Sequence, residues 1–559
     1  MNRDLFINVV HVLGQNWGLV VCLLFCVFWG TLLLFALLKK TTDQQFTDIE
    51  LTALALGGWP LPVLFVSLLI LLLRIFIPDI FVAVITLVII CGSAGYSIYL
   101  VWKRVSLGFL IPVSVFLLFV FLRLGFAAEA ILPPYFDSAE HYRIIQQILD
   151  LSGKTSFTWP TTSYYHLGYH LILAAITSII HVSIDQTMLL FGQIVLAALP
   201  MPVWFLIYRV TQSKTAAAFG VILAAFGWFM PVHAVNWGKY PALLGLLLIQ
   251  FTLGAAVLKN RWLFAFAVIA SILIHTRAAI LFGIFGAAWM FSAMWLDQPR
   301  TRRMFIFIFV LAMFGMLTLL IGQNQIVGPI LEPYRIWVTL LTGLLAVAVF
   351  QSFPRLTFFI ILVMLFMLAG IFIPIRSNLT LLDRPLVEMA LFLPLTFLGG
   401  LGAIRIPKLA VIVFALLIVI HAGLTYDFSP SDCCQLVTRD DATALDWMDR
   451  HIPEDAYVAI AGANLNLDAF GRPMRSAGVD AGIWVLPLTG RASLPLPYSI
   501  DFSAQNTRDL LCSYSVTHIY IGSMPQSFNP DFAKAKPEWY KTIFTLPETD
   551  IVQVINCRG

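Results

Sequence analysis

The sequence predicts a polytopic α-helical membrane protein with a separate α/β domain at its C-terminus. Of the 559 residues, 60% are hydrophobic and 11% are charged, and soluble globular domains of this size do not have such a composition. Apolar runs of roughly 20 residues, the length that crosses a bilayer, recur up to residue 426, and the segment 427–559 lacks them. The net charge of +4 is dispersed over many loops, so nucleic acid is not expected as a partner.

The N-terminal unit, residues 1–104, is expected to cross the membrane three times. Its apolar runs are 17–38, 51–75 and 80–102. Basic pairs follow the first and third runs: Lys39 with Lys40, and Lys103 with Arg104. Basic residues favour the cytoplasmic side, so these ends are expected in the cytoplasm. A fourth run, 106–126, then crosses outward and delivers the polar loop 127–186 to the extracytoplasmic side.

The apolar stretch 167–184 decides the topology of the following core, residues 105–426. If this stretch spanned the membrane, Arg209 and Lys214 would lie outside, against the positive-inside rule. We therefore expect a helix that lies in the outer interface. The later spans then alternate, which gives about fourteen spans in all. They are expected at 188–208, 216–234, 241–258, 262–274, 278–296, 304–321, 336–353, 356–373, 386–403 and 409–426.

The C-terminal segment 427–559 is predicted to form a small α/β domain outside the cytoplasm. DDATALDWMDRHIP has helical spacing, with Asp440 or Asp441 as its N-cap and Pro453 as its stop. Short buried strands are expected at 457–460, 518–522 and 551–555, with a helix at 507–513. A multi-pass protein of the inner (plasma) membrane with an extracytoplasmic, periplasmic domain is the localisation that this topology predicts.

Four cysteines lie in the C-terminal segment: Cys433, Cys434, Cys512 and Cys557. In an oxidising compartment they suit one or two disulfides, although spacing alone does not fix which thiols pair. We expect one of the adjacent pair to bond to one of the two later cysteines.

The polar interruption 132–170 is the candidate active-site loop. If a helix starts after Pro134, Asp137, Glu140 and His141 are at i, i+3 and i+4 and share one face. Such groups are costly to desolvate beside a membrane, so together they indicate a functional site. The alternative is the solvated face of an amphipathic helix.

Aromatic residues and histidines follow in the run TSYYHLGYH. Tyr165 is typical of the aromatic belt at a membrane boundary. His166 and His170 are at i and i+4, a spacing that can bind a metal, but no third ligand is fixed by the sequence. A divalent cation, Mg²⁺ or Mn²⁺, is the cofactor that this region could hold; no cofactor is certain.

Several basic residues are expected on the extracytoplasmic side and are therefore exceptions to the positive-inside rule. They are Lys239 in NWGKYP, Arg277 in HTRA, Arg335 in EPYR, and Arg376 and Arg384 in IRSNLTLLDRP. Cations at the outer interface suit a phosphate or an anionic headgroup, to which arginine offers a bidentate fork. For Arg376 and Arg384, the alternatives are snorkelling and pairing with Asp383.

The segments FDSAEHYRII, YYHLGYH, NWGKYP, LLDRP and DATALDWMDRHIP, taken in this order from about residue 106 onward, resemble the GT-C superfamily of membrane glycosyltransferases. Within that superfamily the chain resembles the protein mannosyltransferase, aminoarabinose transferase and arabinosyltransferase type. This resemblance implies a polyprenyl-phosphate-linked sugar as donor. It also implies a cell-envelope glycan, lipid or protein as acceptor.

The resemblance also implies roles for the singled-out residues. Asp137 would be the general base in an inverting transfer, and Glu140 and His141 would orient the acceptor, tune Asp137 or help to hold a metal. The donor phosphate would lie near Arg384, Arg376, Lys239 and Arg277. Contacts to the acceptor would come from Tyr142, Tyr165, His166 and His170.

Two other classes of protein fit the same residues. A transporter or flippase of a lipid-linked substrate would line its pathway with such carboxylates and arginines. However, no inverted repeat is visible in the sequence, and the polar groups gather on one side of the membrane. A non-catalytic envelope assembly protein would use the C-terminal domain as its binding module.

Overall fold

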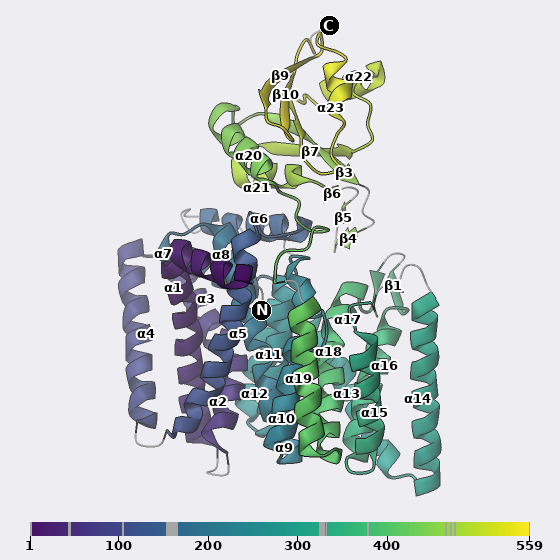
Figure 1. The fold of residues 1–559 in the computed structure, drawn as a ribbon. Coiled ribbons are helices and arrows are strands. Elements are labelled where there is room, and N and C mark those ends of the chain that lie inside the picture. Colours follow the sequence, from purple (N-terminus) through teal and green to yellow (C-terminus); the bar gives the residue numbers. More distant parts are fainter. Residues whose placement is uncertain are drawn as a thin grey trace.

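The computed structural model of the chain describes residues 3–42, 46–102, 105–151, 166–323, 330, 332–376, 379–425, 428–463, 467–469, 472–474 and 477–557. A bundle of helices carries a small α/β domain at one end (Figure 1), which confirms the predicted fold class. Within the described residues, nine helices are long and apolar enough to cross a membrane, and five further apolar helices are shorter. The count of about fourteen spans is therefore not confirmed.

The N-terminal helices coincide with the first four predicted runs. Their bounds are α1 Arg3–Thr41, α2 Asp48–Gly58, α3 Pro60–Leu73, α4 Asp79–Val101, η1 Leu107–Phe109 and α5 Leu110–Glu129. A kink at Asn16 divides α1 just before the predicted start at residue 17. Thr47 and Glu50 form a capping box that begins α2. Pro60 stands at the first turn of α3, where its missing N–H costs least, so α2 and α3 follow each other as one span.

The core helices also fall on the predicted runs. Their bounds are α8 Ile184–Ala198, α9 Met201–Thr211, α10 Lys214–Ile222, η2 Leu223–Gly227, η3 Val232–Val235, α11 Tyr240–Val257, α12 Arg261–Ile274, α13 Ala278–Leu296, α14 Arg300–Gln323, α15 Ile336–Phe350, α16 Pro354–Gly370, β1 Pro374–Arg376, β2 Leu379–Thr380, α17 Arg384–Ala390, α18 Phe392–Gly402, η5 Ala403–Arg405 and α19 Lys408–Thr425. The run predicted at 216–234 is too long, because the helix ends at Gly227. Pro231, which has no N–H, and Gly238, at φ +64°, lie in the turns that follow.

Two helices of the predicted polar loop lie at the end of the bundle that faces the α/β domain. They are α6 Phe136–Leu151 and α7 Gly168–Ile180 (Figure 1). With 13 residues, α7 is about 20 Å long at 1.5 Å per residue, shorter than the hydrocarbon core of about 30 Å. Its length agrees with the expected interfacial helix. The polar loop and the C-terminal domain share one face of the bundle, as the alternating topology requires.

The C-terminal domain contains a six-stranded mixed sheet in the order β6-β3-β8-β10-β9, with β7 paired to β3. In it, β3 runs parallel to β7 and β8, and the other pairs are antiparallel. A separate hairpin joins β4 and β5. The bounds are α20 Arg439–His451, β3 Tyr457–Ala463, β4 Leu467–Ala469, β5 Arg472–Met474, β6 Ala477–Gly478, η6 Ala481–Trp484, α21 Val485–Thr489, β7 Ala492–Pro497, α22 Gln505–Ser513, β8 His518–Ile521, α23 Pro530–Lys534, β9 Tyr540–Thr545 and β10 Asp550–Val554.

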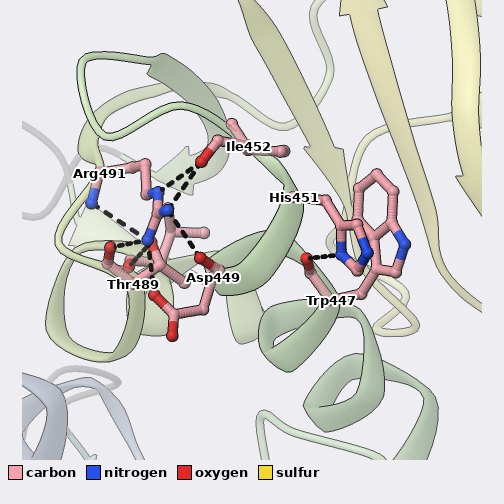
Figure 2. Close-up of polar contacts among 7 residues, drawn as sticks. Trp447, Asp449, His451, Ile452, Thr489 and Arg491 are labelled. Carbon is pink, nitrogen blue, oxygen red and sulfur yellow. Dashed lines mark hydrogen bonds and ion pairs between the residues drawn. The ribbon is translucent and has the colours of Figure 1, made fainter.

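Both ends of α20 are closed by specific hydrogen bonds. The N-cap is Thr438, and Asp441 at the third helical position completes a capping box. The predicted cap, Asp440 or Asp441, is therefore wrong by two or three positions. At the other end, the buried guanidinium of Arg491 donates to the main-chain oxygens of Asp449 and Ile452 (Figure 2), each at 2.7 Å from Nη2. These carbonyls have no partner within the helix, so Arg491 ties α20 to the segment after α21.

The disulfides join Cys512 to Cys557 and Cys433 to Cys434. Two disulfides are present, but the expected pairing between the two groups is wrong. The adjacent cysteines belong to the linker between α19 and α20, where the main-chain oxygen of Cys434 accepts a 2.9 Å hydrogen bond from the amide of Tyr135. That contact holds the linker against the helix bundle. Cys512 lies in the last turn of α22 and pairs with Cys557, three positions after the end of β10.

Candidate active site

The first turn of α6 carries the central acid of the site. Asp137, whose side chain is 18% exposed, forms an ion pair with the amine of Lys239. Its neighbour Ser138 is fully buried and donates a hydrogen bond of 2.5 Å to the carbonyl of Pro134. This bond fixes the turn at Pro134 to the start of α6. It thereby holds Asp137 at the end of the bundle that faces the α/β domain.

Lys239 comes from the turn between η3 and α11, 102 residues from Asp137 in the sequence. Gly238 allows the close approach: at φ +64° a side chain would be strained, and a Cβ there would lie 2.4 Å from the Ser138 hydroxyl. Burial by itself lowers the pKa of Lys239, but the Asp137 carboxylate outweighs burial and raises that pKa above its usual value. The Lys239 amine therefore stays protonated at neutral pH.

Four histidines lie beside this ion pair and form two pairs. His141 Nδ1 is 3.0 Å from His170 Nε2, and both side chains are buried. The rings of His166 and His275 have centroids 4.4 Å apart. Burial, with a contribution from the Lys239 charge, lowers the pKa of His141 to about 3. The imidazole of His141 is therefore neutral, and one nitrogen of the His141–His170 contact donates while the other accepts.

The i, i+4 spacing of His166 and His170 does not produce a shared metal site. Within the parts of the chain that the structure describes, the one group of three with metal-ligand spacing is His233, Cys433 and Cys434, and its cysteines form a disulfide. Mg²⁺ and Mn²⁺ prefer oxygen ligands, whereas the histidines beside Asp137 offer nitrogen, and the carboxylates of Asp137, Glu140 and Asp383 are each ion-paired with a basic side chain. Among the described residues, this set of groups does not fit the divalent cation that the sequence suggested.

Glu140 and Tyr142 contact residues other than Asp137. Glu140 is held by Arg143 on the same helix through two bonds, at 2.6 and 2.9 Å. The ring of Tyr142 packs edge-on against Trp484 of the α/β domain, with centroids 5.7 Å apart. Of the three residues predicted to share one face, Asp137 and His141 thus lie at the site, and Glu140 has a separate partner.

The expected phosphate-binding cations lie along the same end of the bundle, and each described one has a carboxylate partner. Arg277, at the start of α13, is 2.7 Å from the Asp383 carboxylate. Arg384 is 2.8 Å from Glu388, one turn along α17. Asp383, the alternative partner that the sequence offered for Arg384, is the carboxylate that pairs with Arg277. The fields of Arg277 and Asp383 both act on Lys239, so these pairs form one polar region.

Two predicted site residues lie partly or wholly outside the described residues. The backbone of Arg376 belongs to β1, but its side chain is outside the described part, and Tyr165 lies in the undescribed segment 152–165.

Two buried tyrosines, Tyr169 and Tyr240, pack beside the histidines and Lys239, and they were not predicted as site residues from the sequence. The rings of Tyr169 and Tyr240 stack with an interplanar angle of 5° and centroids 6.1 Å apart. Both are buried, and the Tyr169 hydroxyl has no hydrogen-bond partner among the described residues. Tyr169 precedes His170 and Tyr240 follows Lys239, so the motifs that were singled out already contained them. The signal available in the sequence was their position next to His170 and Lys239, at the starts of α7 and α11.

Comparison with known proteins gives a limited result. No family model matches the sequence, and no curated protein matches it. Among solved structures, the arabinofuranosyltransferase AftD from mycobacteria is similar, with a TM-score of 0.47 and 12% identity over 80% of this chain and 40% of that chain. A mutant of AftD gives a TM-score of 0.49 and 14% identity over 79% and 41%.

The chain therefore spans about two fifths of the length of those solved chains. Because both TM-scores are below 0.5, the function proposed below rests on the residues of this chain.

Proposed function

We propose that this protein is a membrane glycosyltransferase of the GT-C type. It transfers a sugar from a polyprenyl-phosphate donor to an acceptor hydroxyl, with inversion at the anomeric carbon. The acceptor is a glycan, lipid or protein of the cell envelope. The protein would lie in the plasma membrane, with α6 and the α/β domain on the extracytoplasmic side.

Asp137 is the proposed general base. As the acceptor oxygen bonds to the anomeric carbon, the bond from that carbon to the phosphate oxygen breaks, and the acceptor proton passes to the Asp137 carboxylate. The products are the glycosylated acceptor and a polyprenyl phosphate. Because a phosphate monoester is already a good leaving group, cations that stabilise its charge take the place of a general acid.

The ion pair between Asp137 and Lys239 is the observation that carries this proposal. In an inverting transfer the base contacts the acceptor on one face of the anomeric carbon and the cation contacts the phosphate that leaves from the other, so the two groups are expected on either side of one sugar ring. The Lys239 amine would exchange the carboxylate for the donor phosphate. That exchange would leave Asp137 free to accept the proton, and Arg277 and Arg384 would extend the cationic surface.

The neutral histidine pair suits a role in orientation. His141 follows Asp137 by one helical turn, and its contact with His170 joins α6 to α7. A neutral imidazole offers one donor and one acceptor, which can bind sugar or acceptor hydroxyls without adding charge to the site.

The test is an assay of the purified protein with a panel of polyprenyl-phosphate pentoses and hexoses. We expect at least one donor to release polyprenyl phosphate, with the sugar passed to water or to an added acceptor. If no donor turns over, and liposomes containing the protein translocate a fluorescent lipid-linked sugar, the transporter class replaces this proposal. Binding without turnover or translocation would favour the assembly-protein class.

A further inference from the structure

The helix α6 is buried on two sides, between the membrane bundle and the α/β domain. Ile144 and Ile145 are fully buried and belong to the hydrophobic core of the bundle. Ala139, which is 2% exposed, belongs instead to the core of the α/β domain. Figure 1 shows α6 lying across the end of the bundle, beneath α20 and α21. The helix that carries Asp137 is therefore a shared element of two hydrophobic cores.

The contact with the α/β domain is centred on Trp484, at the end of η6. Its side chain is fully buried, and its ring meets the Tyr142 ring edge-on at 5.7 Å. Asp480 holds the turn in place: its carboxylate accepts hydrogen bonds from the amide of Gly482 at 2.9 Å and from the hydroxyl of Ser527 at 2.6 Å. The loop after β8 thus holds η6 in place through Asp480, and η6 packs on the outer face of α6.

The linker that leads into the α/β domain makes a second attachment at the start of α6. The amide of Tyr135 donates to the carbonyl of Cys434 at 2.9 Å. The amide of Ser431 donates to the side chain of Asn236, also at 2.9 Å, in the turn that supplies Lys239. The same short linker therefore contacts both of the segments that form the Asp137–Lys239 ion pair.

We infer that the α/β domain positions the catalytic helix, and that Trp484 is a positioning residue for Asp137. This inference rests on the function proposed above. A 16-residue helix is marginally stable by itself in water, and the bundle supports only one of its faces. Packing by Trp484 on the other face restricts rotation and tilt of α6. An error of about 1 Å in the place of a reacting group can cost roughly 10²-fold in rate.

The experiment compares four variants of the full-length protein in nanodiscs. Trp484→Ala removes the contact from the domain side, Tyr142→Ala removes it from the helix side, and Trp484→Phe retains an aromatic ring. Trp539→Ala is the matched control, since Trp539 packs in the second core of the same domain, near Tyr540. The measurements are hydrogen exchange of α6 amides, the dissociation constant for polyprenyl phosphate, and kcat and KM with an active polyprenyl-phosphate sugar.

In both alanine variants, we expect the α6 amides to exchange at least tenfold faster than in the wild type and kcat to fall by roughly 10²-fold. KM and the dissociation constant for polyprenyl phosphate should stay within about threefold of the wild-type values. Trp484→Phe should recover most of the rate, and the double variant should be no worse than either single one. Trp539→Ala should leave α6 exchange unchanged.

Two outcomes overturn the inference. One is unchanged α6 exchange in Trp484→Ala and Tyr142→Ala. The other is an equal effect of Trp539→Ala, which would indicate general loss of the domain. Tyr142→Ala leaves the domain's own core residues in place, so it remains informative if Trp484→Ala does not fold. The exchange measurement needs no substrate, so failure of the proposed enzyme activity is distinguishable from failure of this inference.

Discussion

Lys239 forms an ion pair with Asp137 across 102 residues of sequence. The pair joins the start of α6 to the start of α11, and Gly238 beside it allows the two segments to approach. Two further cations of this face are paired in the same manner, Arg277 with Asp383 and Arg384 with Glu388. A phosphate that binds at Lys239, Arg277 or Arg384 would have to compete with a carboxylate for that cation.

Asp137→Asn should lower sugar transfer by roughly 10²-fold or more, the usual contribution of a general base. The amide keeps the size of the side chain but cannot accept the proton. Binding of polyprenyl phosphate should not weaken, because Lys239 is released from its carboxylate. Initial rates and the dissociation constant for polyprenyl phosphate measure both effects. Asp150→Asn, at an exposed position near the end of the same helix, is the control and should behave as the wild type.

Normal transfer by Asp137→Asn would show that this carboxylate is a solvated or structural acid. The proposed enzyme would then lack its base.

Arg384→Ala should weaken polyprenyl-phosphate binding as well as turnover. A hydrogen bond to a charged group contributes roughly 1.5 to 3 kcal/mol, which corresponds to about tenfold to 150-fold in affinity. The substitution also leaves the buried Glu388 carboxylate without its ion-pair partner. The double variant Arg384→Ala with Glu388→Gln removes that unpaired charge. If the double variant regains wild-type affinity, Arg384 serves the fold and does not bind the phosphate.

Stability of the α/β domain should fall as the pH rises toward neutrality. Burial raises the pKa of Asp480 to about 7 in the folded protein, from an ordinary value of 3.8. The folded state therefore binds the Asp480 proton more tightly than the unfolded state does. This contribution is complete below about pH 4 and is lost as the pH rises through about 7.

Asp480→Asn should remove this pH dependence, since an amide stays neutral and still accepts from Gly482. At pH 8 the variant should be more stable than the wild type, by a few kcal/mol at most. The midpoint temperature for proteolysis of the domain, measured at pH 5 and pH 8 in the full-length protein, tests this. Parallel pH profiles for the variant and the wild type would contradict the assignment.

The disulfide between Cys512 and Cys557 should stabilise the α/β domain by about 2 to 4 kcal/mol, because it closes a long loop in the unfolded chain. The sequence separation is 45 residues. Peptide mapping without reductant should recover these two cysteines as one cross-linked pair, and Cys433 with Cys434 oxidised within one peptide. A cross-link between the two groups would contradict the structure, and the Cys512→Ser variant gives the effect on unfolding.

The spans and the strands of the tail were predictable because their signals are local. Hydrocarbon thickness fixes the length of an apolar run, and the period of apolar residues fixes helix or strand. Thus the helices at Asp79–Val101 and Ala278–Leu296 match their predicted runs within a few residues. The N-cap of α20 was missed because Thr438, Asp440 and Asp441 are all good caps. Which of the three is the N-cap is decided by the backbone conformation in the folded domain.

The sequence by itself determined the class of protein, the positions of the helices, the polar loop with Asp137 and His141, and the outer cations. Tertiary structure decided which of these groups meet: Lys239 with Asp137, His141 with His170, Arg277 with Asp383, and Tyr142 with Trp484. In a membrane bundle most helix surfaces are alike in hydrophobicity, so helix order and rotation depend on the fit of many side chains. Contacts between residues far apart in the chain exist only once that packing has formed.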